Sequence, residues 1–149
     1  MQIADLCYES VTVVRRDSSI HQAAELMRRY HIGTVVVVDI EEGAQVPVGI
    51  VTDRDIVVGV VAMNLDPRDL TAGDIMSDEL VTVPEDYDVY RAMERMRKQG
   101  VRRMPVVNSN GHLTGIVSLD DLLPLVAQEL VEVAKLPSAG RLRECAVRH

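Results

Sequence analysis

The sequence contains no phenylalanine and no tryptophan, and only four tyrosines. The hydrophobic core must therefore be aliphatic. Single-stranded nucleic acids are bound largely by stacking bases on aromatic side chains, and this chain has almost none. Basic residues are also in deficit, because 16 Lys and Arg stand against 23 Asp and Glu, and the net charge is −7. Since phosphate-backbone binding needs a strong local basic patch, we expect no nucleic-acid partner.

Long apolar runs are absent as well. No stretch of about 18 apolar residues is present to span a bilayer, and residues 1–5 lack the basic flank and apolar segment of a secretory signal. The two cysteines, Cys7 and Cys145, lie near opposite ends without CxxC spacing. That pattern favours two reduced thiols over a metal site or a disulfide framework. We expect a cytoplasmic protein with no membrane partner and no bound metal.

The sequence does contain an internal repeat. Residues 20–28 and 89–97 both place apolar side chains at i, i+3, i+4 and i+7, and they are 69 positions apart. This spacing predicts one buried face of an amphipathic helix in each copy. Ser19 and Gln22 form a capping-box sequence at the start of the first helix.

The repeat extends to both sides of these helices. A Val-Thr-Val segment precedes each helix, and each is followed by a β-branched run, a turn signal and a second apolar run. The paired segments are 11–13 and 81–83, 32–38 and 101–107, 41–43 and 108–111, and 49–55 and 115–121. Each copy then closes with a helix. We therefore predict a mixed α+β fold of two βαββα units, packed with pseudo-two-fold symmetry because one unit alone buries too little surface.

The predicted boundaries follow from the breaks in this pattern. Repeat 1 spans residues 1–66 and repeat 2 spans residues 67–135, with Pro67 in the connector. Beyond residue 135, Pro137-Ser138-Ala139-Gly140 interrupts the helical pattern. We expect residues 136–149, which include Arg141, Arg143 and Arg148, to be a disordered basic tail.

The closing helix of repeat 1, residues 56–63, is apolar on every face. Such a helix must be covered on more than one side, and a chain of this size has little material to cover it. We infer a homodimer interface, to which Leu122, Leu123, Leu125 and Val126 of repeat 2 would contribute. The alternative is a fully internal helix. A strand is also compatible with the β-branched composition, but Asp53-Arg54-Asp55 resembles a first helical turn.

A motif that could bind a ligand, Gly-h-h-Thr/Ser-x-x-Asp with h apolar, occurs once in each repeat, at 49–55 and 115–121. It lies where a strand ends and a helix begins. The first helical turn has unpaired backbone N–H groups that favour an anion. The hydroxyl of Thr52 or Ser118 would bond a phosphate oxygen, and the carboxylate of Asp55 or Asp121 would accept from a ribose diol.

An alternative needs no ligand. Thr/Ser-x-x-Asp is close to a capping box, and it also occurs at Thr71–Asp74, where we propose no site. The ligand interpretation depends on recurrence of the longer motif at the same step of both repeats.

These units, with their Val-Thr-Val first strands, their second strands at 33–37 and 102–107, and their Gly-Ile-Val-Thr/Ser-x-x-Asp ends, resemble a pair of cystathionine β-synthase (CBS) domains, also known as a Bateman module. The resemblance covers residues 3 to 130 and extends to small stand-alone bacterial CBS-pair proteins. It implies regulatory binding of an adenosine-containing ligand, such as AMP, ADP, ATP, NAD or S-adenosylmethionine, in clefts between the repeats. It implies no required cofactor.

In such modules each cleft takes residues from both repeats. The resemblance implies that the first cleft joins Thr52, Arg54 and Asp55 with Val81, Thr82, Val83, Arg102, Arg103, Met104 and Pro105. It implies that the second joins Ser118 and Asp121 with Val11, Thr12, Val13, Gly33, Thr34 and Val35.

The two clefts differ in charge. The first has up to three arginines for phosphate, although such arginines are equally compatible with ordinary solvated surface. The second has none, Asp120 adds negative charge, and Thr34 and Val36 stand where the family often has basic residues or proline. We therefore predict one competent nucleotide site, at Thr52 and Asp55.

Three classes of function remain. The first is a nucleotide sensor that signals to an effector protein in trans, and the second is a ligand-free structural or interaction protein that acts through dimerisation. The third, an enzyme, is disfavoured. The sequence has no Gly-x-x-x-x-Gly-Lys-Ser/Thr or Gly-x-Gly-x-x-Gly loop, and the four histidines are scattered without His-x-x-x-His spacing. We predict no catalytic residues.

Overall fold

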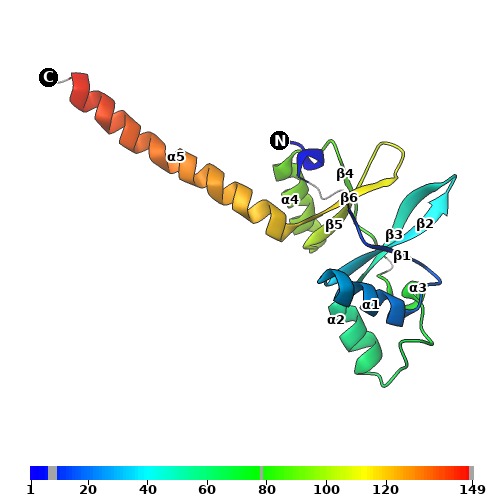
Figure 1. Cartoon of the computed structure of the whole chain (residues 1–149). Coiled ribbons are helices and arrows are strands. Elements are labelled where there is room, and N and C mark those ends of the chain that lie inside the picture. The colour runs from blue at the N-terminus through cyan, green and yellow to red at the C-terminus, as the bar shows by residue number, and fades with distance from the viewer. Residues whose placement is uncertain (7–9, 78, 148–149) are drawn as a thin grey trace. The chain divides into compact units, whose positions relative to one another are not determined.

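The computed structural model describes residues 1–6, 10–77 and 79–147. They form two compact units, residues 1–117 and residues 118–149, whose secondary structure Figure 1 displays. Cys7 and residues 148–149 of the predicted tail lie outside the described residues. The predicted border between the repeats, at residues 66–67, falls in the loop between two helical segments of the first unit.

The predicted βαββα order is confirmed in both repeats. Repeat 1 contains β1 (Val13–Arg15), α1 (Ile20–Tyr30), β2 (Thr34–Glu41), β3 (Ala44–Thr52) and α2 (Asp53–Ile56), which continues into the π-helical turn η2 (Val57–Val61). Repeat 2 contains β4 (Val83–Pro84), α4 (Val89–Gln99), β5 (Arg103–Val107), β6 (Leu113–Ser118) and α5 (Leu119–Val147). A short helix precedes the first strand of each repeat, η1 (Ile3–Asp5) in repeat 1 and α3 (Ala72–Ile75) in repeat 2.

Each repeat has a three-stranded sheet, in the order β1-β2-β3 and β4-β5-β6. In the first sheet β1 is parallel to β2 and β2 is antiparallel to β3, with a register shift between Val37 and Val38. In the second, β4 is parallel to β5 and Val83 pairs with Val106. The antiparallel hairpin brings the end of β3 back beside Thr34 at the start of β2, where Thr34 pairs with Thr52.

The helix ends form where the sequence predicts them. The Ser19 hydroxyl accepts a hydrogen bond from the Gln22 backbone N–H, and the Gln22 side chain accepts one from the Ser19 N–H. Both amphipathic helices have 11 residues and end on a left-handed residue, His31 after α1 and Gly100 after α4. Left-handed C-caps are typical of glycine. Histidine adopts this conformation less readily, yet His31 does so at the end of α1.

The two short leading helices are exchanged between the repeats. The N–H of Ile3 donates to the carbonyl of Tyr87, and the N–H of Ala72 donates to that of Ser18. Ala4 and Gly73 repeat the arrangement, with bonds to Glu85 and Arg16 respectively. Donors and acceptors in each set are equivalent positions of the two repeats. Each repeat is therefore completed by a segment that precedes the other, which ties residues 1–117 into one unit.

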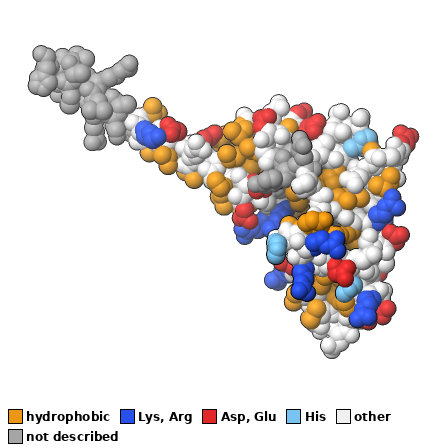
Figure 2. All heavy atoms as spheres, viewed as in Figure 1, with side chains coloured by type: hydrophobic (Ala, Val, Ile, Leu, Met, Phe, Trp, Pro, Cys, Tyr) orange, Lys and Arg blue, Asp and Glu red, His pale blue; other side chains and the backbone are white. Residues whose placement is uncertain are grey.

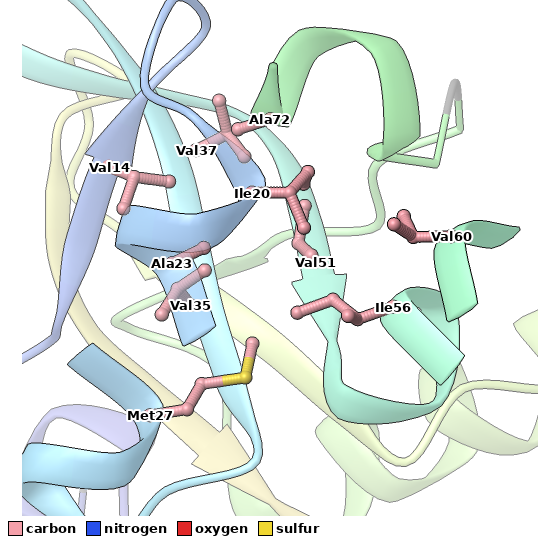
Figure 3. Packing of buried hydrophobic residues seen from close by; sticks show 10 residues of the cluster. All are labelled: Val14, Ile20, Ala23, Met27, Val35, Val37, Val51, Ile56, Val60 and Ala72. Carbon is pink, nitrogen blue, oxygen red and sulfur yellow. The ribbon is translucent and has the colours of Figure 1, made fainter. Parts of the chain in front are cut away.

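The core of repeat 1 is aliphatic, as the composition requires. Figure 3 shows side chains of α1, α2, η2 and the sheet pointing into one cluster. The described residues include no polar or charged side chain that is fully buried. The buried residues shown are Val14, Ile20, Ala23, Met27, Val35, Val37, Val51, Ile56, Val60 and Ala72.

The apolar segment after Asp55 is helical, as predicted, but its middle is π-helical. The N–H of Ala62 donates to the carbonyl of Val57 and that of Leu65 to the carbonyl of Val60, which are i→i+5 bonds. Val60 is fully buried, whereas Val57, Val58 and Val61 are 54–63% exposed. A fully internal helix is therefore wrong for the single chain, because one apolar face points to solvent.

Helix α5 is longer than predicted. It continues through Pro137 and Gly140 and ends at Val147, where the sequence predicts a break and a disordered tail. The flanking Leu, Ala, Arg and Glu residues are good helix formers, and they maintain the helix despite the N–H that Pro137 lacks. No helix in the described part of the chain is long and apolar enough to cross a bilayer.

Candidate functional site

A cavity of about 510 Å³ lies within residues 1–117 and takes its walls from both repeats. The start of β2, the end of β3 and the start of α2 supply one wall, and the segment before β4 and the start of β5 supply the other. The lining residues are Thr34, Ile50, Thr52, Asp53, Arg54, Asp55, Ser77, Glu79, Leu80, Val81, Gly100, Val101, Arg102 and Arg103.

Thr52 and Asp55 form a complete capping box at this cavity. The Asp55 N–H donates to Thr52 Oγ1 at 3.1 Å, and the Thr52 N–H donates to Asp55 Oδ2 at 2.8 Å. Capping, the ligand-free alternative, is therefore a real role of this pair. These bonds use one carboxylate oxygen and one hydroxyl lone pair, which leaves Asp55 Oδ1 and the Thr52 hydroxyl proton for a ligand.

The same box occurs twice more with different surroundings. At Thr71 and Asp74 the reciprocal bonds measure 3.3 Å and 2.9 Å, and neither residue lines the cavity. The N–H and hydroxyl of Thr71 lower the pKa of the Asp74 carboxyl below its ordinary value. In the second repeat, the Ser118 hydroxyl donates to Asp121 Oδ2 at 2.7 Å, so its proton is already engaged.

Arg103 links the two repeats at the edge of the cavity. Its Nη1 donates to Thr34 Oγ1 at 3.0 Å, across 69 positions of sequence. The two residues are equivalent positions of the two repeats and therefore meet near the pseudo-two-fold axis. The expectation that Thr34 belongs to the other cleft needs correction, because Thr34 lines this cavity. Register explains this position, since Thr34 pairs with Thr52 across β2 and β3.

The cavity lining is balanced in charge. Arg54, Arg102 and Arg103 stand against Asp53, Asp55 and Glu79. Sequence reasoning missed Asp53 and Glu79. Asp53 follows Thr52 directly, and an added Cβ on Gly33 would lie 2.9 Å from its Oδ2, so Gly33 makes room for this carboxylate. Asp53 lies inside the Gly-h-h-Thr/Ser-x-x-Asp motif at a variable position, whereas Glu79 lies in the loop before β4, outside any motif.

Six of the ten residues expected in the first cleft line the cavity, and four do not. Val83 and Met104 are fully buried in the core, and Pro105 is buried beside them. Thr82 is half-buried and lies outside the lining. Val83, Met104 and Pro105 are strand residues of β4 and β5 that pack in the interior, and three consecutive residues of β5, Met104 to Val106, are buried.

The residues expected in the second cleft are distributed differently. Val11, Thr12 and Val13 line a separate cavity of about 560 Å³, together with Ser10, Leu26, Tyr30 and Ile32. Val35 is fully buried, and Gly33 lies against Asp53. Ser118 and Asp121 belong to the second unit. Their capping box, described above, is the geometry available for this half of the expected site.

No group of three or more His, Cys, Asp or Glu side chains gathers as a metal site among residues 1–6, 10–77 and 79–147. The chemistry of the described cavity is therefore carried by three guanidinium groups, three carboxylates and the hydroxyls of Thr34, Thr52 and Ser77. Such a lining would bind a polar ligand that presents both an anionic group and hydrogen-bond donors.

Comparison with known proteins finds relatives over most of the chain. Protein MK0525 of Methanopyrus kandleri is 42% identical over 118 residues, which are 74% of this chain and 59% of that protein. The chain thus spans less than two thirds of that relative. Hypoxic response protein 1 of Mycobacterium tuberculosis is 31% identical over 118 residues, 79% of this chain and 80% of that protein.

Solved structures show the same architecture. The CBS domain pair of protein MJ0100, in complex with 5′-methylthioadenosine and S-adenosyl-L-methionine, has a TM-score of 0.74 and 26% identity, with 87% of this chain and 98% of that chain covered. The CBS domain family matches residues 3–61 and 72–128. The chain therefore belongs to the CBS domain family and carries two CBS domains in tandem.

Proposed function

We propose that the protein is a regulatory module that binds an adenosine-containing nucleotide in the cavity between its repeats and signals to a partner protein in trans. The observation that carries the proposal is the composite lining. Thr52 and Asp55 of repeat 1 face the same cavity as Arg102 and Arg103 of repeat 2. The complex of the MJ0100 CBS pair with two adenosine derivatives supports this choice of ligand class.

Binding at such a site would change how the repeats hold one another. An anionic ligand would compete with the Thr34 hydroxyl for Arg103, because a guanidinium binds an anionic phosphate or carboxylate more strongly than it binds a neutral hydroxyl oxygen. The bond between Arg103 and Thr34 joins the two repeats. A ligand that replaces it would shift the packing of residues 1–117, and a partner that prefers one packing would respond to the ligand.

The balanced lining favours ligands of small net charge. Three arginines and three carboxylates neutralise one another, so a triphosphate would bring excess negative charge near Asp53, Asp55 and Glu79. We propose AMP, NAD or the net-cationic S-adenosylmethionine ahead of ATP, with ADP between them.

Thermal unfolding with each nucleotide tests this function. A ligand that binds only the native state raises the Tm, and at 100 times its Kd the added stability is about 2.7 kcal/mol. We expect AMP or S-adenosylmethionine to raise the Tm by several degrees and ATP to raise it less. Glu79→Gln should reduce the difference between the Tm increases that AMP and ATP cause. Glu42→Gln, in the exposed β2–β3 turn, should leave this difference unchanged. No shift with any adenosine compound would contradict the proposal.

We also propose that the module acts without turnover. Its cavity holds arginines and carboxylates, but the carboxylates Asp53 and Asp55 already accept backbone hydrogen bonds, which suits binding rather than proton transfer. Incubation with AMP, ATP or S-adenosylmethionine should release no product over many equivalents of ligand. Multiple-turnover release of adenosine or phosphate would make the protein an enzyme.

A second candidate function, interaction through homodimerisation without a ligand, is supported by the exposed face of η2. Val57, Val58 and Val61 present adjacent branched side chains to solvent, which is typical of an interface rather than of a free surface. We propose that a second copy covers this face. The two functions are compatible, since the cavity residues are different ones.

Val57→Asp/Val61→Asp should therefore reduce self-association at least tenfold, measured by sedimentation equilibrium. Each buried charge would lack a partner at the interface, which is costly. Ile40→Asp is the control, because Ile40 is an exposed apolar residue near the hairpin end of β2, where it pairs with Gln45, whereas α2 and η2 follow the opposite end of β3. Equal association of both variants would remove η2 from the interface.

A further inference from the structure

Arg95 of α4 carries a buried hydrogen-bond donor that the fold does not use. Its Nε is enclosed by the protein and makes no hydrogen bond, although the residue as a whole is only half-buried. Lys98 on the same helix, in contrast, places Nζ 2.7 Å from Glu94 Oε1, and acidic side chains accompany basic ones on the face that Figure 2 displays. Since a buried unpaired donor costs stability, the position of Arg95 needs an explanation.

Strand pairing determines which residues of the two repeats correspond. Val14 pairs with Val37 in the first sheet and Val83 pairs with Val106 in the second, so equivalent residues lie 69 positions apart. The matching helices α1 and α4 have the same offset. The Val-Thr-Val segments, which the sequence matches at an offset of 70, are therefore shifted by one residue in the structure.

At this offset the cavity of about 510 Å³ corresponds to the cavity of about 560 Å³ in repeat 1. Four of the seven residues that line the larger cavity have equivalents that line the smaller one, namely Glu79, Leu80, Val81 and Val101. Leu26 also lines the larger cavity, and its equivalent is Arg95. Repeat 2 thus has an arginine at this wall of the nucleotide cavity, where repeat 1 has an apolar side chain.

We propose that Arg95 is a specificity-determining residue of the nucleotide cavity, and that its guanidinium turns toward the cavity and binds the phosphate of the ligand. This inference rests on the function proposed above. A guanidinium presents two parallel N–H donors that match two oxygens of a phosphate. The unpartnered Nε–H of Arg95 supplies one of the two donors, and no bond within the protein has to be broken to release it.

Arg95 also decides between two ligands that the balanced lining admits. Three arginines and three carboxylates line the cavity, so a fourth guanidinium makes the site cationic. The phosphate monoester of AMP carries about −1.5 to −2 charges at pH 7, whereas S-adenosylmethionine is a net cation, with a sulfonium, an ammonium and one carboxylate. Arg95 therefore favours AMP over S-adenosylmethionine.

Arg95→Leu, which introduces the residue found at the equivalent position of repeat 1, tests the proposal by isothermal titration calorimetry. We expect the affinity for AMP to fall at least tenfold, and the affinity for adenosine, which has no phosphate, to change less than threefold. Affinity for S-adenosylmethionine should stay equal or rise. Arg95→Lys should lose part of the AMP affinity, because lysine retains the charge without the paired donors.

Arg97→Leu is the matched control. It removes the same charge from an exposed position two residues along α4, on another side of the helix, and should leave all three affinities within threefold of the original. Equal losses for AMP and adenosine in Arg95→Leu, or equal losses of AMP affinity in Arg95→Leu and Arg97→Leu, would overturn the role in phosphate binding.

Thermal unfolding without nucleotide gives a second readout. Arg95→Leu should raise the Tm, because it removes the unpaired buried donor, and a lowered Tm would assign Arg95 to support of the fold instead. An original protein that binds neither AMP nor adenosine would refute the proposed function and this inference together. If the original protein binds AMP and Arg95→Leu binds it as tightly, the nucleotide site stands and only the role of Arg95 is refuted.

Discussion

Thr52→Ala and Asp55→Ala should each lower the affinity for the bound adenosine nucleotide at least tenfold and also destabilise the fold by about 1 kcal/mol. The loss of stability follows from the capping box, whose two bonds measure 3.1 Å and 2.8 Å. The loss of affinity follows because both residues line the cavity and the cap leaves the Thr52 hydroxyl proton and Asp55 Oδ1 unused. Isothermal titration calorimetry with AMP and ATP measures the affinity, and urea unfolding measures the stability.

Thr71→Ala and Asp74→Ala separate the two effects. This pair forms the same reciprocal box at the start of α3, so its variants should show a similar loss of stability. Neither residue lines the cavity, and nucleotide affinity should stay within about twofold of the original. A loss of affinity in both sets of variants would mean that the motif acts only through folding.

Asp121→Ala tests the predicted asymmetry between the clefts. In the second repeat the Ser118 hydroxyl already donates to Asp121. The residues expected to form the second cleft also include no arginine that could bind a phosphate. We expect Asp121→Ala to change the stability but to leave the calorimetric affinity of the Thr52 site intact. Equal losses in Asp55→Ala and Asp121→Ala would reject one competent site in favour of two.

The repeat carries most of what the sequence could predict. The matching helices, strands and Gly-h-h-Thr/Ser-x-x-Asp motifs predict the order of elements. The resemblance to CBS pairs, in contrast, is what implies that Thr52, Asp55, Arg102 and Arg103 share one cavity, which they line. These signals are periodic or duplicated, so one sequence is enough to detect them. The duplicated motif also made a third box, at Thr71, recognisable as a cap without a site.

The exchanged leading helices and the position of Thr34 could not be predicted in the same way. Helix η1 has three residues and α3 has four, which is too short for any hydrophobic period to appear. Their partners, Tyr87 and Ser18, are reached through backbone carbonyls, which every residue carries. Thr34 lines the first cavity because of strand pairing, and pairing register depends on the whole sheet.

The length of α5 shows a different limit. Proline and glycine at 137 and 140 are strong local breakers, and a rule based on them ends the helix too early. Propensity is a weak prior that context overrides, and here the helix continues to Val147.

Gly49→Ala should destabilise residues 1–117 by about 1–3 kcal/mol, the usual cost of overpacking a filled core. An added Cβ at Gly49 would lie 2.5 Å from Met76 Sδ and 2.9 Å from Met76 Cβ and Cγ. A flexible thioether can turn away from one contact, but two of these atoms lie near the backbone end of the side chain. Urea unfolding monitored by circular dichroism measures the loss.

Gly59→Ala is the control, and its expected effect on stability has the opposite sign. Gly59 lies in the π-helical turn η2, and an added Cβ there would meet only Ile75 Cδ1, at an ordinary 3.9 Å. Gly59→Ala should therefore stabilise the protein by up to about 1 kcal/mol, because alanine has the better helix propensity and less unfolded-state freedom. Destabilisation by both substitutions to the same extent would show that close packing at Gly49 is not the cause.

A double-mutant cycle connects this contact to the nucleotide site. As a single substitution, Met76→Ala should destabilise the protein because it removes core packing. Combined with Gly49→Ala it should restore part of the lost stability, since it removes the atoms that the new methyl group meets. The residues that directly follow Gly49 and Met76 are Ile50 and Ser77, and both line the cavity. There the Ser77 N–H donates a hydrogen bond to the Ile50 carbonyl at 3.4 Å. Gly49→Ala should therefore weaken nucleotide binding as well, and the double variant should restore binding together with stability. Recovery of stability without recovery of affinity would contradict the idea that this contact sets the distance between the two walls of the site.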